Sequence, residues 1–479
     1  MTRKIKSRHR SVWAFSLSVA ALSASGLLAV SQPSQAQSLS CVSADSRANA
    51  SGGFTIPGNC TQYFGNGATF PGLFYRRFAD YFGIAIPANT GGQTGAVGTQ
   101  PTTPTGSPRA NTVQYNYCLT GSGNGRAVFV GTASASATCS YTASFSGGIV
   151  TPGNGTAAPA VFPTTSTANP PLFAGSDVPL SSSELSSYAA NRQGSRGLPI
   201  QVPTVFGAVA LAYNNNLTST LSLSTSDLCG IFDGSLTDWS QIQGTGGLSG
   251  PINVIIRSDS SGTTNIFTSY LAAACGSGYY LSGGVNTFPT GLPQTARFVR
   301  VAGNDGIVNT VASTSFAVGY AEASFTAPFS TNTPSGQPAP RSALVQNPAS
   351  GGGFVAPVVS TIRSSLGSVA LQATNSSYPC VLQVNPSSLP VLPTNPAAYP
   401  IVGATYALLY SRYPSADQAD AARGLFLNIL GNAPFGRLGA NDQVAQGLGF
   451  VVLTTGSTIQ QRNDLRAQAR ACVSAITSP

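Results

Sequence analysis

An arginine and a cluster of hydroxyl side chains precede a helix in the segment "IRSDSSGTTNIFTSYL", residues 256–271. The apolar run "PINVII" that leads into it predicts a buried strand, and the apolar spacing after Gly262 predicts a helix. The unpaired backbone N–H groups of the first helical turn, and the positive end of the helix dipole, then lie beside Arg257. These groups all favour negative charge, so the segment predicts an anion-binding site.

Three other segments place polar residues where a helix begins. Thr69 stands in "GNGATFPGLF", before a helix predicted from Pro71. Ser122 lies in "TGSGNG", which predicts a glycine-rich loop after a strand. "GSDVPLSSSEL" places Asp177 in a turn, ahead of a capping box that starts at Ser181. All three segments could supply groups to the same anion site.

Each of these residues also has an ordinary structural role as an alternative. Thr69 and Ser122 could cap helices or turns, and Asp177 could form an Asx turn without any ligand. Arg257 could be a surface ion-pair partner of Asp259. The combination of all of them in one chain is what favours the anion site.

Composition limits the remaining chemistry. Residues 1–36 combine five basic residues, an apolar stretch and the small-residue pattern Ser34–Gln35–Ala36, which predicts a cleaved secretory signal peptide rather than a membrane anchor. We therefore expect a soluble exported protein, periplasmic or extracellular. Cleavage would also remove the only histidine, the only methionine and both lysines of the chain.

The mature chain then has 18 arginines against 14 acidic residues, because five of the 23 Lys and Arg residues leave with the signal peptide. This mild positive charge lacks the clustered basic stripe of a nucleic-acid-binding protein. Without histidine or lysine, Ser-His-Asp catalysis, histidine-ligated metals and lysine Schiff bases are excluded. We expect no nucleic-acid partner, no metal and no cofactor, and we expect binding rather than catalysis.

The eight cysteines are an even number in an exported chain, which predicts disulfides. Eight cysteines allow 105 pairings, and among these we favour neighbours along the chain. The favoured pairs are Cys41–Cys60, Cys118–Cys139, Cys229–Cys275 and Cys380–Cys472.

Apolar runs that alternate with helical segments predict two lobes of α/β type. Segments rich in Gly, Pro, Ser and Thr predict long surface insertions between these elements. The predicted insertions are residues 84–112, 146–172 and 326–342.

Six motifs follow one another along the chain: "GNGATFP", "TGSGNG", "FAGSDVPLSSSEL", "QVPTVFGAVALAYNN", "LCGIFDGSLTDWSQI" and "RSDSSGTTNIFTSYL". In this order and spacing they resemble the phosphate-binding proteins of ABC transporters, the PstS type, over most of residues 61–479. "ELSSYAANRQG" and Cys275 are similar to its DING-type branch, although "TQYFGNG" stands where that branch has "DINGG".

The resemblance implies a two-lobed periplasmic-binding-protein fold with a ligand cleft between the lobes. Residues 37–202 and 351–479 would form the first lobe, and residues 203–350 the second. The implied phosphate-binding residues are Thr69, Phe70, Ser122 and Asp177 from the first lobe, and Arg257, Ser261, Gly262 and Thr263 from the second. Asp259 would hold the Arg257 guanidinium in place, and Ser260 stands where many relatives have glycine.

Asp177 is an unusual residue for an anion site, because a carboxylate repels an anion unless the ligand has a proton to donate. Monohydrogen phosphate has such a proton and sulfate at neutral pH has none. The hypothesis is that Asp177 rejects sulfate.

We thus expect an exported, monomeric, non-enzymatic protein that captures inorganic phosphate for an ABC-type phosphate permease, a partner that the family resemblance implies. Two alternatives stay open. A secreted phosphohydrolase of the same fold would use Ser122 or Ser261 as nucleophile and a carboxylate as base. The other alternative is a phosphate scavenger without a transporter, or a structural surface protein, which the loops rich in Gly, Pro, Ser and Thr would suggest.

Overall fold

The computed structural model describes eleven stretches of the chain. They are residues 61–75, 113–133, 170–215, 220–243, 245, 247–291, 297–333, 335–367, 369–431, 445–453 and 459–479. The predicted signal peptide, the insertion at 84–112 and most of that at 146–172 lie outside these residues. Within them, no helix is long and apolar enough to cross a membrane.

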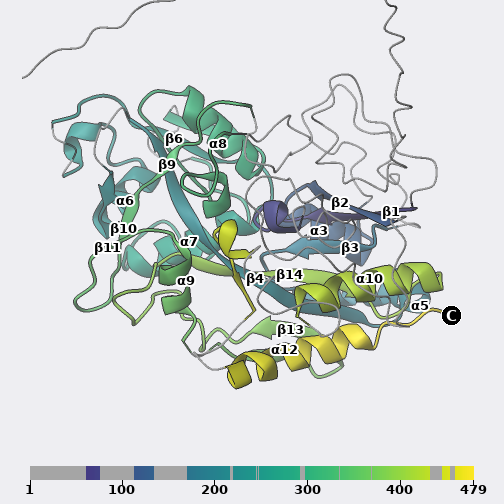
Figure 1. The fold of residues 1–479 in the computed structure, drawn as a ribbon. Helices are drawn as coiled ribbons and strands as arrows, with labels where there is room; N and C mark the ends of the chain where they lie inside the picture. The colour runs from purple at the N-terminus through teal and green to yellow at the C-terminus, as the bar shows by residue number, and fades with distance from the viewer. Residues whose placement is uncertain are drawn as a thin grey trace, which may run out of the picture. The chain divides into compact units, whose positions relative to one another are not determined.

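Twelve of the described strands form one mixed sheet (Figure 1). Its main path runs β2 (Val113–Leu119), β1 (Thr61–Gly67), β3 (Phe173–Ser176), β14 (Val402–Tyr410), β4 (Pro199–Asn214), β8 (Ala317–Glu322), β6 (Asn253–Arg257) and β7 (Phe298–Val301). Off this path lie β9 (Arg341–Ser342), β12 (Leu371–Asn375), β13 (Tyr378–Val384) and β15 (Val451–Val452). A smaller sheet contains β5 (Ser222–Leu223), β10 (Leu344–Gln346) and β11 (Phe354–Val355).

The helices lie between and beside these strands. The described α-helices are α3 (Ser122–Val130), α4 (Ser182–Asn191), α5 (Gln193–Arg196), α6 (Thr225–Asp233), α7 (Gly262–Ala274), α8 (Gly303–Ser313), α9 (Val359–Ser365), α10 (Ala416–Ile429) and α12 (Ile459–Ser474). Two short 3₁₀ helices, η1 (Trp239–Gln241) and η3 (Ala323–Phe325), complete the set.

Strand β4 connects the two ends of the large sheet. Its first part pairs with β14, from Pro199 opposite Tyr410 to Ala208 opposite Val402, with a register shift at Thr204. Its last six pair with β8, beginning with Val209 opposite Glu322. The side chains along β4 are buried at almost every position, which matches its nearly continuous β-branched, aromatic and alanine-rich sequence.

Parallel strands end side by side at two places in the sheet. At the end of β1, Gly67 lies opposite both Leu119 of β2 and Gly175 of β3. In β6, Arg257 lies opposite Val301 of the parallel strand β7. Ligands of open α/β sheets bind beyond the carboxyl ends of parallel strands, where the loops into the helices gather. The predicted anion-site residues all follow these strand ends.

The segment "TGSGNG" differs from its prediction as a loop. Helix α3 begins at Ser122 and includes the following glycines, with Gly121 at φ +85° as its N-cap. The glycines are needed for close packing, since a Cβ on Gly125 would lie 2.5 Å from the carbonyl oxygen of Gly175. Tertiary packing therefore outweighs the low helix propensity of glycine here.

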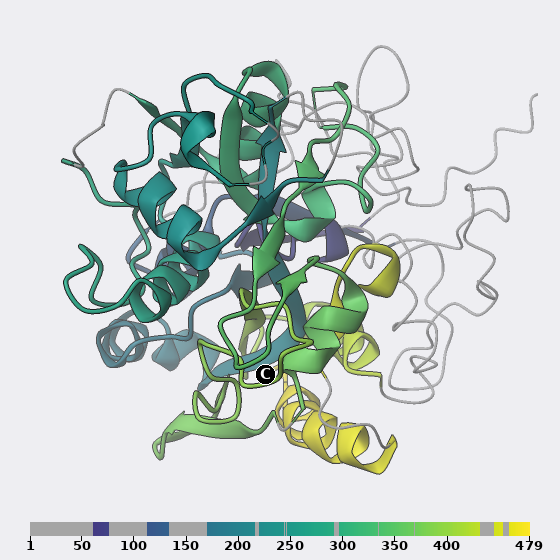
Figure 2. The same cartoon turned by 90° about the vertical axis from the view of Figure 1, so that its left-hand side faces the viewer.

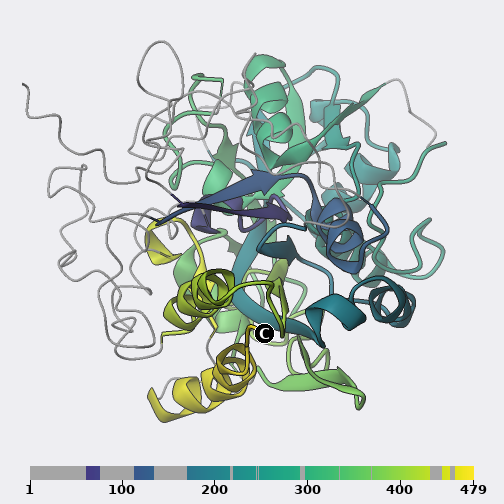
Figure 3. The ribbon, with the colours of Figure 1, turned by 90° about the vertical axis from the view of Figure 1, so that its right-hand side faces the viewer.

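Two of the predicted disulfides, Cys229–Cys275 and Cys380–Cys472, are confirmed. Cys118 is also disulfide-bonded, and its predicted partner Cys139 lies outside the described residues, as does the pair Cys41–Cys60. The Cys380–Cys472 bridge joins β13 to α12, and Figures 2 and 3 show from opposite sides that the β12–β13 hairpin lies next to this last helix.

Replacing both Cys380 and Cys472 with serine should lower the free energy of unfolding by about 4 kcal/mol, because the bridge closes a long loop in the unfolded chain. The cysteines are 92 residues apart in sequence. Urea unfolding of the oxidised proteins measures the change, with fully reduced wild type as a second reference. A loss below about 1 kcal/mol would show that the bridge hardly restricts the unfolded chain.

Candidate anion-binding site

Arg257, the last residue of β6, is fully buried, and Asp259 holds its guanidinium with both carboxylate oxygens. The Nε–Oδ1 distance is 2.6 Å and the Nη2–Oδ2 distance is 2.5 Å. Burial alone would raise the pKa of Asp259, but the Arg257 charge and its hydrogen bonds lower that pKa below its ordinary value. The predicted pairing of these two residues is confirmed, and it fixes the guanidinium plane.

Two further groups contact the Nη1 atom of the same arginine. It lies 3.0 Å from Oδ1 of Asn304 and 3.5 Å from Oγ1 of Thr263. Asn304 is the second residue of α8, and Thr263 is the second residue of α7. The starts of two helices therefore lie beside one buried cation.

Ser261 is the N-cap of α7, because its Oγ accepts a hydrogen bond from the backbone N–H of Thr264 at 3.1 Å. This contact uses the acceptor side of the hydroxyl and leaves its O–H to donate elsewhere. Ser261 is only 1% exposed. It thus fills the ordinary structural role of a cap and keeps a donor for a ligand.

Asp177 lies beyond the end of β3 and accepts hydrogen bonds on both carboxylate oxygens. Ser122 Oγ donates to Oδ2 at 3.0 Å, and the hydroxyl of Thr405 on β14 donates to Oδ1. Burial raises the pKa of Asp177 to about 7, although these hydrogen bonds and the charges of Arg257 and Arg126 act in the opposite direction. A carboxyl group of this kind changes its protonation state near neutral pH.

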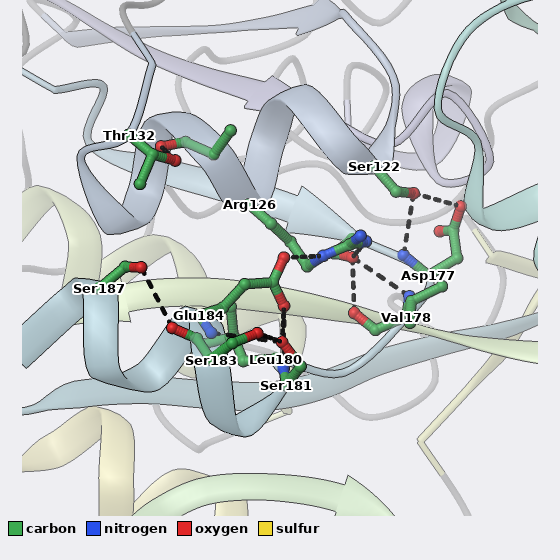
Figure 4. Close-up of polar contacts among 12 residues, drawn as sticks. Ser122, Arg126, Thr132, Asp177, Val178, Leu180, Ser181, Ser183, Glu184 and Ser187 are labelled. Carbon is green, nitrogen blue, oxygen red and sulfur yellow. Dashed lines mark hydrogen bonds and ion pairs between the residues drawn. The ribbon is translucent and has the colours of Figure 1, made fainter. Parts of the chain in front are cut away.

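A second buried arginine supports the turn that carries Asp177 (Figure 4). Arg126 on α3 lies one turn after Ser122, and its Nη1 donates to Ser176 Oγ at 3.0 Å. Its Nε pairs with Glu184 of α4 at 2.7 Å, and Glu184 also completes the predicted capping box with Ser181. This network anchors the residues on either side of Asp177 to two helices.

The segments at the two strand ends are in contact with each other. A Cβ on Gly262 would lie 2.6 Å from both Asp177 Oδ2 and Ser122 Oγ, so only glycine fits at this position. The backbone N–H of Gly123 donates to the carbonyl oxygen of Ser260 at 3.0 Å. The sequence-predicted residues on α3, after β3 and on α7 therefore share one site.

Thr69 and Phe70 follow β1 and are also buried. The hydroxyl of Thr69 has no hydrogen-bond partner in the structure, and its methyl carbon would lie 3.7 Å from a Cβ built on Gly303. The ring of Phe70 packs in the core against Phe450 and Gly207, so this residue can offer a ligand its backbone N–H but not its side chain. All eight predicted site residues are therefore buried, and the segments that carry them are in contact, with Phe70 placed there through its neighbour Thr69.

Three contributors were missed by sequence reasoning: Thr405, Asn304 and Arg126. Thr405 is a single polar residue within the apolar strand "VGATYALLY", and such an interruption is a signal that could have marked it. Arg126 lies four residues after Ser122 and therefore on the same helix face. Asn304 lies in "AGNDG", where the sequence itself gives no sign of its contact with Arg257.

Chemically, the site offers a cation, several O–H and N–H donors and one carboxyl acceptor in a buried space. This set fits a small oxyanion that carries a proton. Among the described residues, no group of three or more His, Cys, Asp or Glu side chains is placed to hold a metal ion.

Comparison with known proteins places the chain in a family. A model described as "PBP superfamily domain" matches residues 108–426. A phosphate-binding protein of an unknown prokaryotic organism is 39% identical over 163 residues, 33% of this chain and 43% of that relative's own length. The phosphate-binding protein PstS 3 of Mycobacterium tuberculosis is 34% identical over 314 residues, 64% of this chain and 74% of that protein.

Two further likenesses cover more of the chain. The protein named alkaline phosphatase L of Pseudomonas aeruginosa is 30% identical over 396 residues, 81% of this chain and 84% of that protein. A solved structure of a high affinity periplasmic phosphate-binding protein, PfluDING, bound with phosphate at pH 8.5, matches with a TM-score of 0.59 and 26% identity. That match covers 88% of this chain and all of the solved one.

The chain belongs to the PBP superfamily, and the predicted α/β periplasmic-binding-protein fold is confirmed. Within this superfamily it is a PstS-type protein, as the six sequence motifs predicted, and it lies near the DING-type branch, as "ELSSYAANRQG" and Cys275 predicted.

Proposed function

We propose that this protein captures inorganic phosphate in the buried anion site and delivers it to an ABC-type phosphate permease. The observation that carries the proposal is the position of Asp177, a carboxyl acceptor held among buried donors near Arg257. Monohydrogen phosphate can donate its P–OH proton to this carboxylate while its other oxygens accept hydrogen bonds. The binding residues are Thr69, Phe70, Ser122, Asp177, Arg257, Ser261, Gly262 and Thr263.

The remaining donors suit the unprotonated oxygens of the ligand. Thr69 Oγ1 is buried without a partner, and Ser261 keeps its O–H for donation. The backbone N–H of Gly262 lies at the first residue of α7, where the helix dipole also favours an anion. Asp259 acts on the ligand only through Arg257, whose orientation it fixes.

The names of the relatives support phosphate as the ligand, since three of the proteins compared above are named phosphate-binding proteins.

The burial of the site residues suggests how the ligand enters. Because the site residues are buried and pack on one another, phosphate enters when the residues after β1 and β3 and at the start of α3 separate from those after β6. Residues 37–202 with 351–479, and residues 203–350, form the two lobes of this proposal, which β4 connects.

The same proposal covers location and assembly. Residues 1–36 have the pattern of a secretory signal peptide, so the mature protein works in the periplasm or outside the cell. We expect it to work as a monomer, without a cofactor and without enzymatic turnover.

A phosphohydrolase is the second candidate, because one relative is named alkaline phosphatase L and because Ser122 donates to Asp177 as a nucleophile would to a base. Turnover of p-nitrophenyl phosphate that disappears in Ser122→Ala would favour this function. Turnover that persists in both Ser122→Ala and Arg257→Ala comes from a contaminant.

The test of phosphate capture is calorimetric titration of phosphate-stripped protein at pH 9, where the Asp177 carboxyl group is ionised, first with phosphate and then with sulfate. We expect tight binding of one phosphate per chain and much weaker binding of sulfate. Folded, stripped protein that gives no heat with phosphate would contradict the proposal. Equal affinity for the two anions would contradict the role given to Asp177.

A further inference from the structure

Asn304 is a buried amide side chain at the edge of the anion site. It is fully buried, and its Oδ1 lies 3.0 Å from Nη1 of Arg257. A guanidinium group only donates hydrogen bonds, so the amide atom that faces it must be the oxygen. The Nδ2 of Asn304 then points elsewhere, and it has no hydrogen-bond partner in the structure.

An unpaired buried donor costs free energy, because water satisfied it in the unfolded chain. Asn304 shares this property with Thr69, whose hydroxyl is also buried without a partner. The two residues are close in space, since a Cβ on Gly303, the residue before Asn304, would lie 3.7 Å from Thr69 Cγ2. Two neighbouring segments therefore each carry a buried donor without a partner, and one of these residues, Asn304, contacts Arg257.

The hydrogen bonds of Arg257 show where its remaining donors point. A guanidinium has five N–H groups. Asp259 accepts one hydrogen bond from Nε and one from Nη2, and Asn304 Oδ1 accepts one from Nη1. Thr263 Oγ1 accepts a longer hydrogen bond from Nη1 at 3.5 Å, so the second N–H of Nη2 is the one that remains for a ligand. Asn304 and Asp259 hold the guanidinium from two sides.

We propose that Asn304 is a further anion-binding residue, whose Oδ1 holds Arg257 and whose Nδ2 donates to an oxygen of the bound phosphate. The inference rests on the proposed function, because it concerns the same site. An amide N–H serves the oxygens of any tetrahedral anion equally well. Asn304 therefore raises affinity without choosing phosphate over sulfate, a choice that depends on Asp177.

Calorimetry on three variants tests this role. Asn304→Ala and Asn304→Asp both lack the amide nitrogen, and each should weaken phosphate binding by about 100-fold, as for a hydrogen bond to a charged group. Asn309→Asp is the matched control on the same helix, because its Oδ1 accepts from the N–H of Ser335 at 3.0 Å and the change in charge is identical. The control should bind within about threefold of wild type.

The preference for phosphate over sulfate in Asn304→Ala should equal that of wild type, whereas a general loss of structure would change it. Thermal melting without phosphate shows whether each variant folds. If Asn304→Ala does not fold, the result for Asn304→Asp decides, because aspartate has the same size as asparagine. A folded Asn304 variant that binds phosphate within about threefold of wild type overturns the inference.

A crystal structure of the phosphate complex gives an independent answer. An Nδ2 within about 3.2 Å of a phosphate oxygen supports the contact, and one beyond about 4 Å from every phosphate oxygen overturns it. Wild-type protein that binds no phosphate would instead contradict the proposed function itself, so the two failures are distinguishable.

Discussion

Replacing Arg257 with alanine should weaken phosphate binding by about 1,000-fold, the largest effect on phosphate affinity expected of any single change in this protein. The guanidinium is fully buried and is the one cation that contacts the predicted donors of α7 among the described residues. Its removal also leaves the carboxylate of Asp259 without its partner beside the anion. Both consequences act against a negatively charged ligand, and calorimetry of the stripped variant measures their sum.

Arg363, an exposed residue of α9, provides a matched control for this change. Arg363→Ala removes the same side chain and the same charge far along the chain from the site, and it should bind phosphate as wild type does. Arg257→Lys should fall between wild type and Arg257→Ala, since lysine keeps the charge but cannot pair with both oxygens of Asp259. Phosphate affinity in Arg257→Ala within tenfold of wild type would remove the arginine from the site.

At pH 9, where the Asp177 carboxyl group is ionised, Asp177→Asn should reduce the preference for phosphate over sulfate by about 1,000-fold or more. Sulfate at neutral pH has no proton to donate to the Asp177 carboxylate, which repels it. Asparagine removes the charge and adds an N–H donor, so sulfate should gain affinity while phosphate loses some. Titration with both anions measures the ratio, and Asp417→Asn, an exposed change at the start of α10, is the control.

The pH dependence of sulfate binding provides a second readout of the same residue. Because burial raises the pKa of Asp177 to about 7, the free protein carries a neutral carboxyl group below this pH. A neutral carboxyl group donates a hydrogen bond to sulfate, so sulfate affinity in wild type should rise as pH falls from 9 toward 7 by about tenfold per unit. The Asp177→Asn variant should show no such slope, and a slope that persists in it would assign the titration to another group.

Local sequence patterns predicted the elements around Arg257 well. The strand before Arg257, the helix from Gly262 and the capping box at Ser181 all appear where their residues indicated. These features depend on residues within a few positions of one another, so a single sequence carries the necessary information. The eight candidate residues came from the resemblance to a family, and the structure brings them together.

The residues missed by sequence reasoning depend on long-range pairing. Thr405 meets Asp177 only because β14 pairs with β3 across the sheet, although the two residues are 228 positions apart in sequence. Asn304 meets Arg257 because β6 and β7 are neighbours, which places the start of α8 beside the end of β6. The start of α3 was misjudged for a related reason, since the packing of its glycines against other strands decides its conformation.

The contact between α3 and the residues before α7 restricts the order in which this protein can change over evolution. A Cβ on Gly123 would lie 2.1 Å from Oγ and 2.4 Å from Cβ of Ser260, whereas the carbonyl oxygen of Ser260 would be 3.3 Å away. Position 123 is therefore closed to other residues for as long as position 260 carries a side chain. A lineage that starts from this sequence must therefore acquire glycine at 260 before position 123 can vary, because the reverse order passes through a clash with the Ser260 side chain.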